Sequence, residues 1–196
     1  MYSQNQEEPI ILAYFSKNMG KLLDIGAYDG EMFSNTRQLL EDGWTGVMVE
    51  ASPVNFVKLM EATDHMSDRL QLWNVALVPD KSGPMAWHDS CGDAVSTLSD
   101  KHLEKWAHHG EWRKFYINTL NVMDFFERVG TDYDFLILDV EGINYELLMA
   151  MPYDLLNRLK LICIEYDSHM QAVTDYLNDF GFKVIHRNGE NLIFAK

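Results

Sequence analysis

The sequence is short of cysteine, and this shortage limits the kinds of fold that it can adopt. Only Cys91 and Cys163 occur among 196 residues, too few for the disulfide framework of a small secreted domain. Cys163 lies in the apolar run Leu-Ile-Cys-Ile. We therefore expect it to be a buried free thiol in a reducing cytoplasm.

Basic residues and long apolar runs are also scarce. Sixteen Lys and Arg residues stand against thirty Asp and Glu residues, which gives a formal net charge of −14. Such a surface repels phosphate backbones, so we expect no nucleic-acid partner. No apolar run reaches the roughly 18 residues of a transmembrane helix, and the polar, acidic N-terminus does not resemble a signal peptide. The sequence therefore predicts a cytoplasmic protein without a membrane span.

Several catalytic motifs are missing as well. The chain has no G-x-G-x-x-G, which disfavours an NAD-dependent dehydrogenase, no H-E-x-x-H zinc spacing and no G-x-S-x-G nucleophile. Apolar residues, in contrast, make up 47% of the chain, enough to fill the core of an α/β domain. We expect a lead-in at residues 1–20 and a single domain at residues 21–196.

The stretch Lys21–Gly30 has the pattern around which such a domain is organised. An apolar strand runs into a turn with Gly26 and Gly30, and carboxylates stand at Asp24 and Asp29. Strand, glycine turn and helix form the nucleotide crevice of α/β sheets, and glycine lets a ligand approach the backbone. The acidic flank repels a pyrophosphate but suits a ligand with an amino group and a cationic centre, such as S-adenosylmethionine.

A second strand, Thr45–Glu50, ends in an acid 20 residues after Gly30. A carboxylate at this place accepts hydrogen bonds from both hydroxyls of a ribose. An ordinary tight turn and a solvated glutamate would explain each feature separately. Their occurrence together, at this separation, favours a cofactor site.

Strands and helices alternate along the chain in the way typical of a mostly parallel sheet. The apolar and amphipathic segments predict strands at 45–50, 70–77, 133–140 and 159–165, helices at 33–42, 53–62, 99–109, 121–129, 144–151 and 170–180, and a final hairpin of 182–187 and 192–195. Residues 78–120 lack a clear period, so we expect an irregular excursion there on the substrate side of the site.

Two buried strands end in acidic residues, which are candidates for catalysis. Asp139 and Glu141 follow one strand, and Glu165 follows the other. If these strands are neighbours, the three carboxyls crowd together at one end of the sheet. Crowding raises the pKa of a carboxyl group and makes it a general base. Alternatively, Asp139 and Glu165 hold a divalent cation. A third possibility is that the acids only cap helices and form ion pairs. His88, in the irregular region, is a further candidate base, although a surface histidine has the same pattern.

Taken together, these motifs resemble those of the FkbM-type methyltransferases, which use S-adenosylmethionine, over nearly the whole chain. The resemblance rests on Asp24–Gly30 as the cofactor loop and on Asp139-Val-Glu-Gly142, the most distinctive motif of the family. Further similar segments are Ser3-Gln4 with Glu7-Glu8, Ser34-Asn-Thr36, and Gly43-Trp44-x-Gly46 up to Glu50-Ala-Ser-Pro53.

The resemblance implies a Rossmann-like class I methyltransferase fold, an α/β architecture whose mostly parallel seven-stranded sheet ends in an antiparallel hairpin. It implies that the methionine part of the cofactor lies at the glycine loop, the ribose at Glu50, the adenine near Ala51, and the reacting methyl group by Asp139 and Glu141. The full set of expected cofactor residues is Asp24, Gly26, Ala27, Asp29, Gly30, Glu50, Ala51, Ser52, Asn74, Ala76 and Asp139.

The chain departs from the family at two places. Members often carry a lysine ahead of the second motif, where this chain has Ile137-Leu138, and a glutamate three residues after Glu141, where it has Asn144. The resemblance implies an O-methyltransferase acting on a hydroxyl of a carbohydrate or secondary metabolite, with Asp139, Glu141 and His88 as candidate bases. The departures keep a second hypothesis open, a non-catalytic binding or scaffold protein with the same fold. The sequence leaves metal dependence and oligomeric state open.

Overall fold

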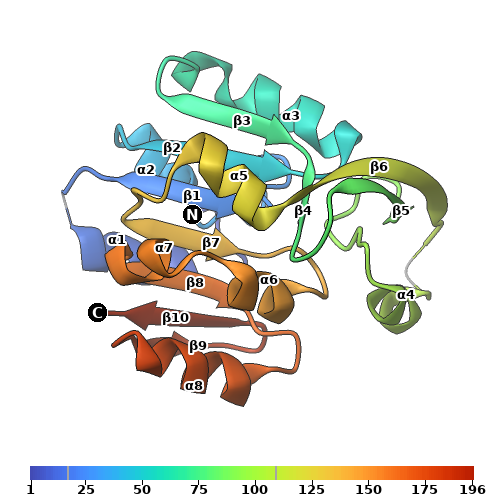
Figure 1. The fold of residues 1–196 in the computed structure, drawn as a ribbon. Helices are drawn as coiled ribbons and strands as arrows, with labels where there is room; N and C mark the ends of the chain where they lie inside the picture. The colour runs from blue at the N-terminus through green and yellow to red at the C-terminus, as the bar shows by residue number, and fades with distance from the viewer. Residues whose placement is uncertain (17, 109) are drawn as a thin grey trace.

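The structure is a computed structural model that describes residues 1–16, 18–108 and 110–196. It places a seven-stranded sheet between two layers of helices, and a smaller three-stranded sheet projects from one end (Figure 1). No helix within the described ranges is both long enough and apolar enough to cross a membrane.

The large sheet has the order β3-β2-β1-β7-β8-β10-β9. Neighbouring strands run parallel except around β10, which is antiparallel to both β8 and β9. This arrangement confirms the predicted mostly parallel sheet with an antiparallel C-terminal hairpin. The strands are β1 (Lys21–Ile25), β2 (Thr45–Glu50), β3 (Leu70–Asn74), β7 (Phe135–Leu138), β8 (Leu161–Glu165), β9 (Lys183–Arg187) and β10 (Asn191–Ala195).

Helices cover both faces of this sheet, which explains why its central strands are continuously apolar. Leu22 packs into the cluster on one face and its neighbour Leu23 into the cluster on the other, and both are fully buried. One layer contains α1 (Glu7–Phe15), α2 (Arg37–Glu41) and α3 (Pro53–Thr63), followed by the short 3₁₀ turn η1 (Asp64–Met66). The other contains α5 (Val122–Val129), α6 (Asn144–Ala150), α7 (Tyr153–Arg158) and α8 (Met170–Asp179).

The helix expected at 33–42 is shorter than predicted and begins only at Arg37. The side chains before it explain the late start. Ser34 accepts a hydrogen bond from the Arg37 N–H through Oγ, and Thr36 turns its hydroxyl to Asp24. Phe33, with φ of 61°, has a backbone conformation incompatible with a right-handed helix.

The prediction that residues 78–120 are irregular is wrong. The segment expected as one strand at 70–77 divides between β3 and β4 (Ala76–Val78), and β4 pairs with β6 (Arg113–Asn121) in the small sheet. β5 (Gly83–Asp89) pairs antiparallel with β6 along its whole length. Most of β6 and the first half of β5 are at least partly exposed, whereas Trp87, His88 and Asp89 at the end of β5 are buried as a run. Neither strand therefore alternates regularly between buried and exposed residues over its whole length. α4 (Asp100–Trp106) lies between them; position 109, the predicted end of this helix, is outside the described residues.

Candidate active site

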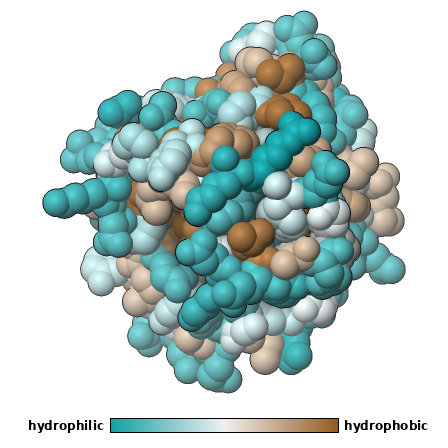
Figure 2. Space-filling view, turned by 90° about the vertical axis from the view of Figure 1, so that its right-hand side faces the viewer, coloured by the Kyte–Doolittle hydropathy of each residue, from teal (hydrophilic) through white to brown (hydrophobic). Residues whose placement is uncertain are grey.

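Residues at the carboxyl ends of β1, β2 and β7 line an open pocket. These strand ends lie on the right-hand side of Figure 1, the side that faces the viewer in Figure 2. The space among the lining residues, with the open solvent at the mouth included, is about 1030 Å³. On this face, apolar groups lie among a mostly hydrophilic surface (Figure 2). The predicted cofactor residues that line the pocket are Asp24, Gly26, Ala27, Glu50, Ala51, Ala76 and Asp139.

Two other predicted cofactor residues lie behind the pocket and shape its glycine turn. The Asp29 carboxylate accepts hydrogen bonds from the backbone N–H groups of Glu31 and Met32, at 2.9 and 2.8 Å. Gly30 has φ of 76°, and a Cβ there would lie 2.7 Å from a methyl of Leu59. The structure therefore gives Asp29 and Gly30 roles in turn geometry and in packing against α3.

Ser52 and Asn74 likewise act on the backbone around the pocket rather than line it. Ser52 caps α3, because its hydroxyl accepts a hydrogen bond from the Asn55 N–H. The Asn74 amide donates to the carbonyls of Glu50 and Ala51, at 2.9 and 3.2 Å. Asn74 thus fixes the backbone that carries Glu50 into the site.

Asp24 is a buried carboxyl at the pocket floor. Its Oδ2 accepts a hydrogen bond from the Thr36 hydroxyl at 2.6 Å. Loss of solvent raises its pKa to about 6, and the hydrogen bond from Thr36 offsets part of this rise. A buried acid of this kind is stabilised by a ligand that brings a positive charge.

Glu50 is held at the end of β2 by backbone groups on both sides. Its Oε2 accepts from the Tyr28 N–H at 2.9 Å and its Oε1 from the Ser52 N–H at 2.7 Å. Burial nevertheless raises its pKa to about 7. A carboxylate offers about four acceptor positions, so Glu50 keeps lone pairs for two further donors, as the hydroxyls of a ribose would supply.

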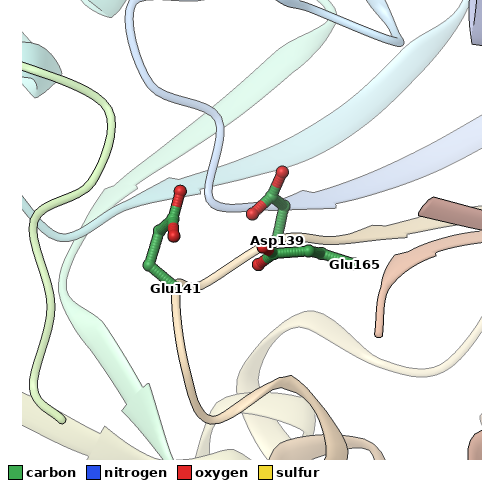
Figure 3. A group of neighbouring side chains, drawn as sticks. All are labelled: Asp139, Glu141 and Glu165. Atoms are coloured by element: carbon green, nitrogen blue, oxygen red, sulfur yellow. The ribbon is translucent and has the colours of Figure 1, made fainter. Parts of the chain in front are cut away.

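The predicted crowding of Asp139, Glu141 and Glu165 is confirmed. One oxygen from each lies within 4.8 Å of the others, and Figure 3 shows Glu165 reaching from the neighbouring strand toward Asp139. Burial raises the pKa of Asp139 well above its usual range, and the charge of Glu141 adds to this rise. The pKa of Glu165 is raised by burial and by the hydrogen bond and charge of Asp139. Burial and mutual repulsion therefore favour a protonated form in this pair of carboxyls.

Asn144 explains how this cluster tolerates its own charge. Its Nδ2 donates to Glu165 at 2.9 Å and to Asp167 at 2.7 Å, while its Oδ1 accepts from the Val140 N–H at 2.8 Å. Asn144 is fully buried. An amide supplies donors where the glutamate often found in the family would add another carboxylate, so this departure is chemically consistent with the acids around it.

Glu141 is contacted by residues that sequence reasoning missed. Its Oε2 lies 2.8 Å from Nε2 of His102, a buried residue of α4, and its carbonyl accepts a hydrogen bond from the Thr97 hydroxyl at 2.6 Å. No motif marks either residue in the sequence. Only the folding of the small sheet and α4 against the Asp139–Gly142 motif brings them to it.

His88, the third predicted base, is not among the residues that line the pocket. Its ring is buried and Nε2 lies 2.8 Å from Oδ1 of Asp100. The β-bridge between His88 and Thr97 ties β5 to the loop ahead of α4. The structure therefore gives His88 a place in the scaffold of the small sheet.

The 90–99 loop closes one side of the pocket, and sequence reasoning did not predict its contacts. Ala94, Ser96 and Leu98 of this loop line the pocket, and the Tyr28 hydroxyl donates to the Gly92 carbonyl at 3.0 Å. Trp87, also in the wall, has a buried indole N–H without a hydrogen-bond partner among the described residues.

The N-terminal segment contributes Gln4 to the pocket wall. Glu7, at the start of α1, anchors this segment: its Oε1 accepts from the side-chain amides of Asn188 and Asn191, at 2.6 and 2.9 Å. The hairpin turn at the opposite end of the chain thereby holds residues 1–6 near the site.

These residues fit S-adenosylmethionine. Buried carboxylates at Asp24 and Glu50 meet the amino group and the ribose hydroxyls that this cofactor would bring. The small side chains of Ala51 and Ala76 leave room for a flat base, and the unpaired Trp87 N–H lies in the same wall. Buried acids without a positively charged partner at one part of the pocket and small apolar side chains at another match the two ends of this molecule.

Comparison with known proteins agrees with this geometry. A family model described as the methyltransferase FkbM domain matches residues 24–184. Among solved structures, the FkbM methyltransferase of Methylobacillus flagellatus KT has a TM-score of 0.61 at 12% identity, covering 91% of this chain and 44% of that one. A putative RNA methyltransferase of Pyrococcus horikoshii has a TM-score of 0.53 at 11% identity, covering 97% and 80%.

The ribosomal protein L11 methylase of Lactobacillus delbrueckii subsp. bulgaricus has a TM-score of 0.52 at 11% identity, covering 97% of this chain and 75% of that one. No curated protein matches the sequence. Likeness at these identities establishes the class I methyltransferase fold. The family model covers both motifs and most of the chain, and we conclude that this protein belongs to the FkbM family of S-adenosylmethionine-dependent methyltransferases.

Proposed function

We propose that this protein transfers a methyl group from S-adenosylmethionine to a hydroxyl of a carbohydrate or secondary metabolite. The observation that carries the proposal is the pocket that joins Asp24 and Glu50 to the crowded carboxyls of Asp139 and Glu141. The first pair suits the cofactor, and the second lies where a hydroxyl would need to lose its proton.

In this proposal Asp24, Gly26 and Ala27 surround the methionine part of the cofactor, Glu50 binds the ribose, and Ala51 and Ala76 flank the adenine. When bound, S-adenosylmethionine supplies a methyl group on a cationic sulfur, which keeps the bonding pair when the methyl passes to a nucleophilic oxygen. The remaining requirements, an aligned and deprotonated acceptor, are met by the side chains of the protein.

Asp139 is the first candidate for the proton acceptor and Glu141 the second. Burial and the nearby charges raise the pKa of Asp139, which makes its ionised form a stronger base than a solvated aspartate. Its hydrogen bond with Glu165 fixes the carboxylate in the pocket. The hydroxyl proton would pass to this carboxylate while the acceptor oxygen gains the methyl.

The acceptor is expected to be neutral and partly apolar. The net charge of −14 disfavours polyanions, and exposed Met32 and Phe33 stand among the residues that line the pocket. A sugar ring or a related metabolite presents a hydroxyl together with an apolar face that such side chains can contact.

Calorimetric titration with S-adenosylmethionine and S-adenosylhomocysteine tests the cofactor assignment, with Asp24→Ala as the control. We expect micromolar binding that the control loses. Absence of binding to the folded wild-type protein would favour the second hypothesis, a non-catalytic protein that kept the methyltransferase fold.

Asp139→Asn tests the catalytic assignment, because it keeps the shape of the side chain and removes its basicity. We expect the affinity for S-adenosylhomocysteine to stay within a few-fold and turnover to fall by about 100-fold or more. Release of S-adenosylhomocysteine in the presence of a set of methyl glycosides measures turnover. Equal loss of cofactor binding and folding in this variant would contradict a role as base.

The same carboxyls offer a second use, because Asp139, Glu141 and Glu165 have the oxygen donors that a divalent cation accepts. The hydrogen bond between Asp139 and Glu165 and the amide of Asn144 stabilise the cluster without a cation. We therefore expect turnover to survive dialysis against EDTA. Loss of turnover that Mg²⁺ or Mn²⁺ restores would instead assign these acids to a metal.

A further inference from the structure

Glu141 is held in the pocket by α4 and the loop before it. The Glu141 carboxylate lies 2.8 Å from His102 Nε2, and its carbonyl accepts from Thr97 at 2.6 Å. Gly142 adds a third contact, because a Cβ on Gly142 would lie only 2.8 Å from Cβ of His102. α4 is thus packed directly against the backbone of the motif.

This support is needed because the position of Glu141 is unfavourable on its own. Its φ of 55° is a conformation that a residue with a side chain rarely adopts. Its carboxylate also faces Asp139 and Glu165, whose charges repel it (Figure 3). Without a partner, the Glu141 side chain would lower its electrostatic energy by turning away from these acids.

His102 provides that partner and is almost completely buried, whereas 18% of the Glu141 side chain is exposed. His102 Nε2 lies 2.8 Å from Glu141 Oε2 without forming an aligned hydrogen bond, and this contact engages one carboxylate oxygen and leaves the other for a ligand. Glu141 lines the pocket and His102 does not. The imidazole therefore acts on the site only through Glu141.

We propose that His102 is a positioning residue for methyl transfer: it holds Glu141 beside Asp139 so that the acceptor hydroxyl lies between two carboxylates. This inference rests on the proposed function. It implies that α4, which lies far from the cofactor motifs in the sequence, is part of the catalytic architecture. His102 touches no reacting atom and takes no proton in this arrangement.

The test is a double-mutant cycle that combines His102→Leu with Glu141→Gln. Turnover is measured as S-adenosylhomocysteine released with a set of methyl glycosides, and cofactor affinity is measured by calorimetry. We expect each single variant to lower kcat by about 10- to 100-fold and to leave the Kd for S-adenosylhomocysteine within twofold. The double variant should be no slower than Glu141→Gln alone.

Conservative replacements separate positioning from packing. Glutamine places an amide nitrogen near the position of Nε2, so His102→Gln should recover most of the turnover, whereas His102→Asn, which reaches only as far as Nδ1, should not. These two variants also decide the question if His102→Leu does not fold. The matched control is His65→Gln, at a histidine paired with Glu41 outside the pocket lining, and it should turn over at the wild-type rate.

Two results would overturn the inference while leaving the proposed function in place. One is full additivity, in which His102→Leu slows the Glu141→Gln enzyme as much as the wild type. The other is a parallel loss of cofactor affinity, which indicates a structural role alone. If the wild-type protein binds the cofactor but methylates none of the glycosides, the proposed function fails in its acceptor class and this inference fails with it.

Discussion

Gly26 lies at the closest approach between the cofactor loop and the catalytic motif. Its φ is 97°, and a Cβ built on it would lie 1.7 Å from the Asp139 carbonyl oxygen. No side-chain rotation relieves a contact with backbone, so the two motifs can only be adjacent if this residue is glycine. The absence of a side chain at Gly26 thus allows the proposed base to lie beside the loop proposed to bind the cofactor.

We expect Gly26→Ala to destabilise the protein by more than about 3 kcal/mol or to prevent folding. Urea unfolding measures the effect. Gly189→Ala is the control, because a Cβ there meets no atom within 4 Å, and it should change stability by less than about 0.5 kcal/mol. Similar stability of the two variants would mean that the contact at Asp139 relaxes without cost.

The raised pKa of Asp24 predicts how stability depends on pH. An acid that titrates near 6 in the folded chain and at 3.8 when solvated binds its proton more tightly in the folded state. Asp24 therefore contributes about 3 kcal/mol to the free energy of unfolding below pH 4, and this contribution is lost as the pH rises through 6.

Asp24→Asn removes this pH-dependent contribution to stability and retains an oxygen that accepts the hydrogen bond from the Thr36 hydroxyl. Between pH 4.5 and 7.5, the free energy of unfolding should therefore fall less steeply in the variant than in the wild type. Urea titrations at several pH values measure both slopes. Equal slopes would show that Asp24 does not titrate in this range.

The helices and strands that the sequence predicts well are those in which burial on both faces, or a local cap, restricts the choice of residues. Leu22 and Leu23 are buried on opposite faces, so β1 has adjacent buried apolar residues and is recognisable as a central strand. Ser52 with Pro53 marks the start of α3, since capping depends only on neighbouring residues. The site residues in these elements could be predicted for the same reason.

The elements that could not be predicted depend on contacts between distant parts of the chain. β5 and β6 satisfy each other's backbone by pairing residue by residue, and burial along β5 is confined to Trp87, His88 and Asp89, so no alternating apolar pattern marks this strand. Thr36 leaves its expected helix because its hydroxyl bonds to Asp24. His102 reaches Glu141 only after α4 has packed on Gly142, so its role is not visible in any local pattern.

Ser52 provides a test at this scale, because the family resemblance assigns it to the cofactor whereas the structure gives its hydroxyl to α3. We expect Ser52→Ala to lower stability by about 1 kcal/mol and to leave the affinity for S-adenosylhomocysteine unchanged. Thermal unfolding and calorimetry measure the two effects, with the exposed Ser67→Ala as control. A loss of affinity without a loss of stability would return Ser52 to the cofactor site.

At the scale of the whole molecule, the net charge leads to a prediction about RNA as an acceptor. Solved structures with this fold include a putative RNA methyltransferase, yet a net charge of −14 opposes the approach of a polyanion. We expect no retardation of transfer RNA in a gel at physiological salt with micromolar protein. Specific binding under these conditions would contradict the proposed acceptor class.

The place of β10 in the sheet has a consequence for how the chain reaches its native state. β10 is made after β9, yet it lies between β9 and β8 and joins them. Until residues 191–195 have left the ribosome, β8 exposes an unpaired edge and β9 has no neighbour. A nascent chain at this stage presents the backbone groups that favour pairing with other chains. The sheet therefore closes only once β10 has been made, and a chain that stops between β8 and β10 has an unpaired strand edge.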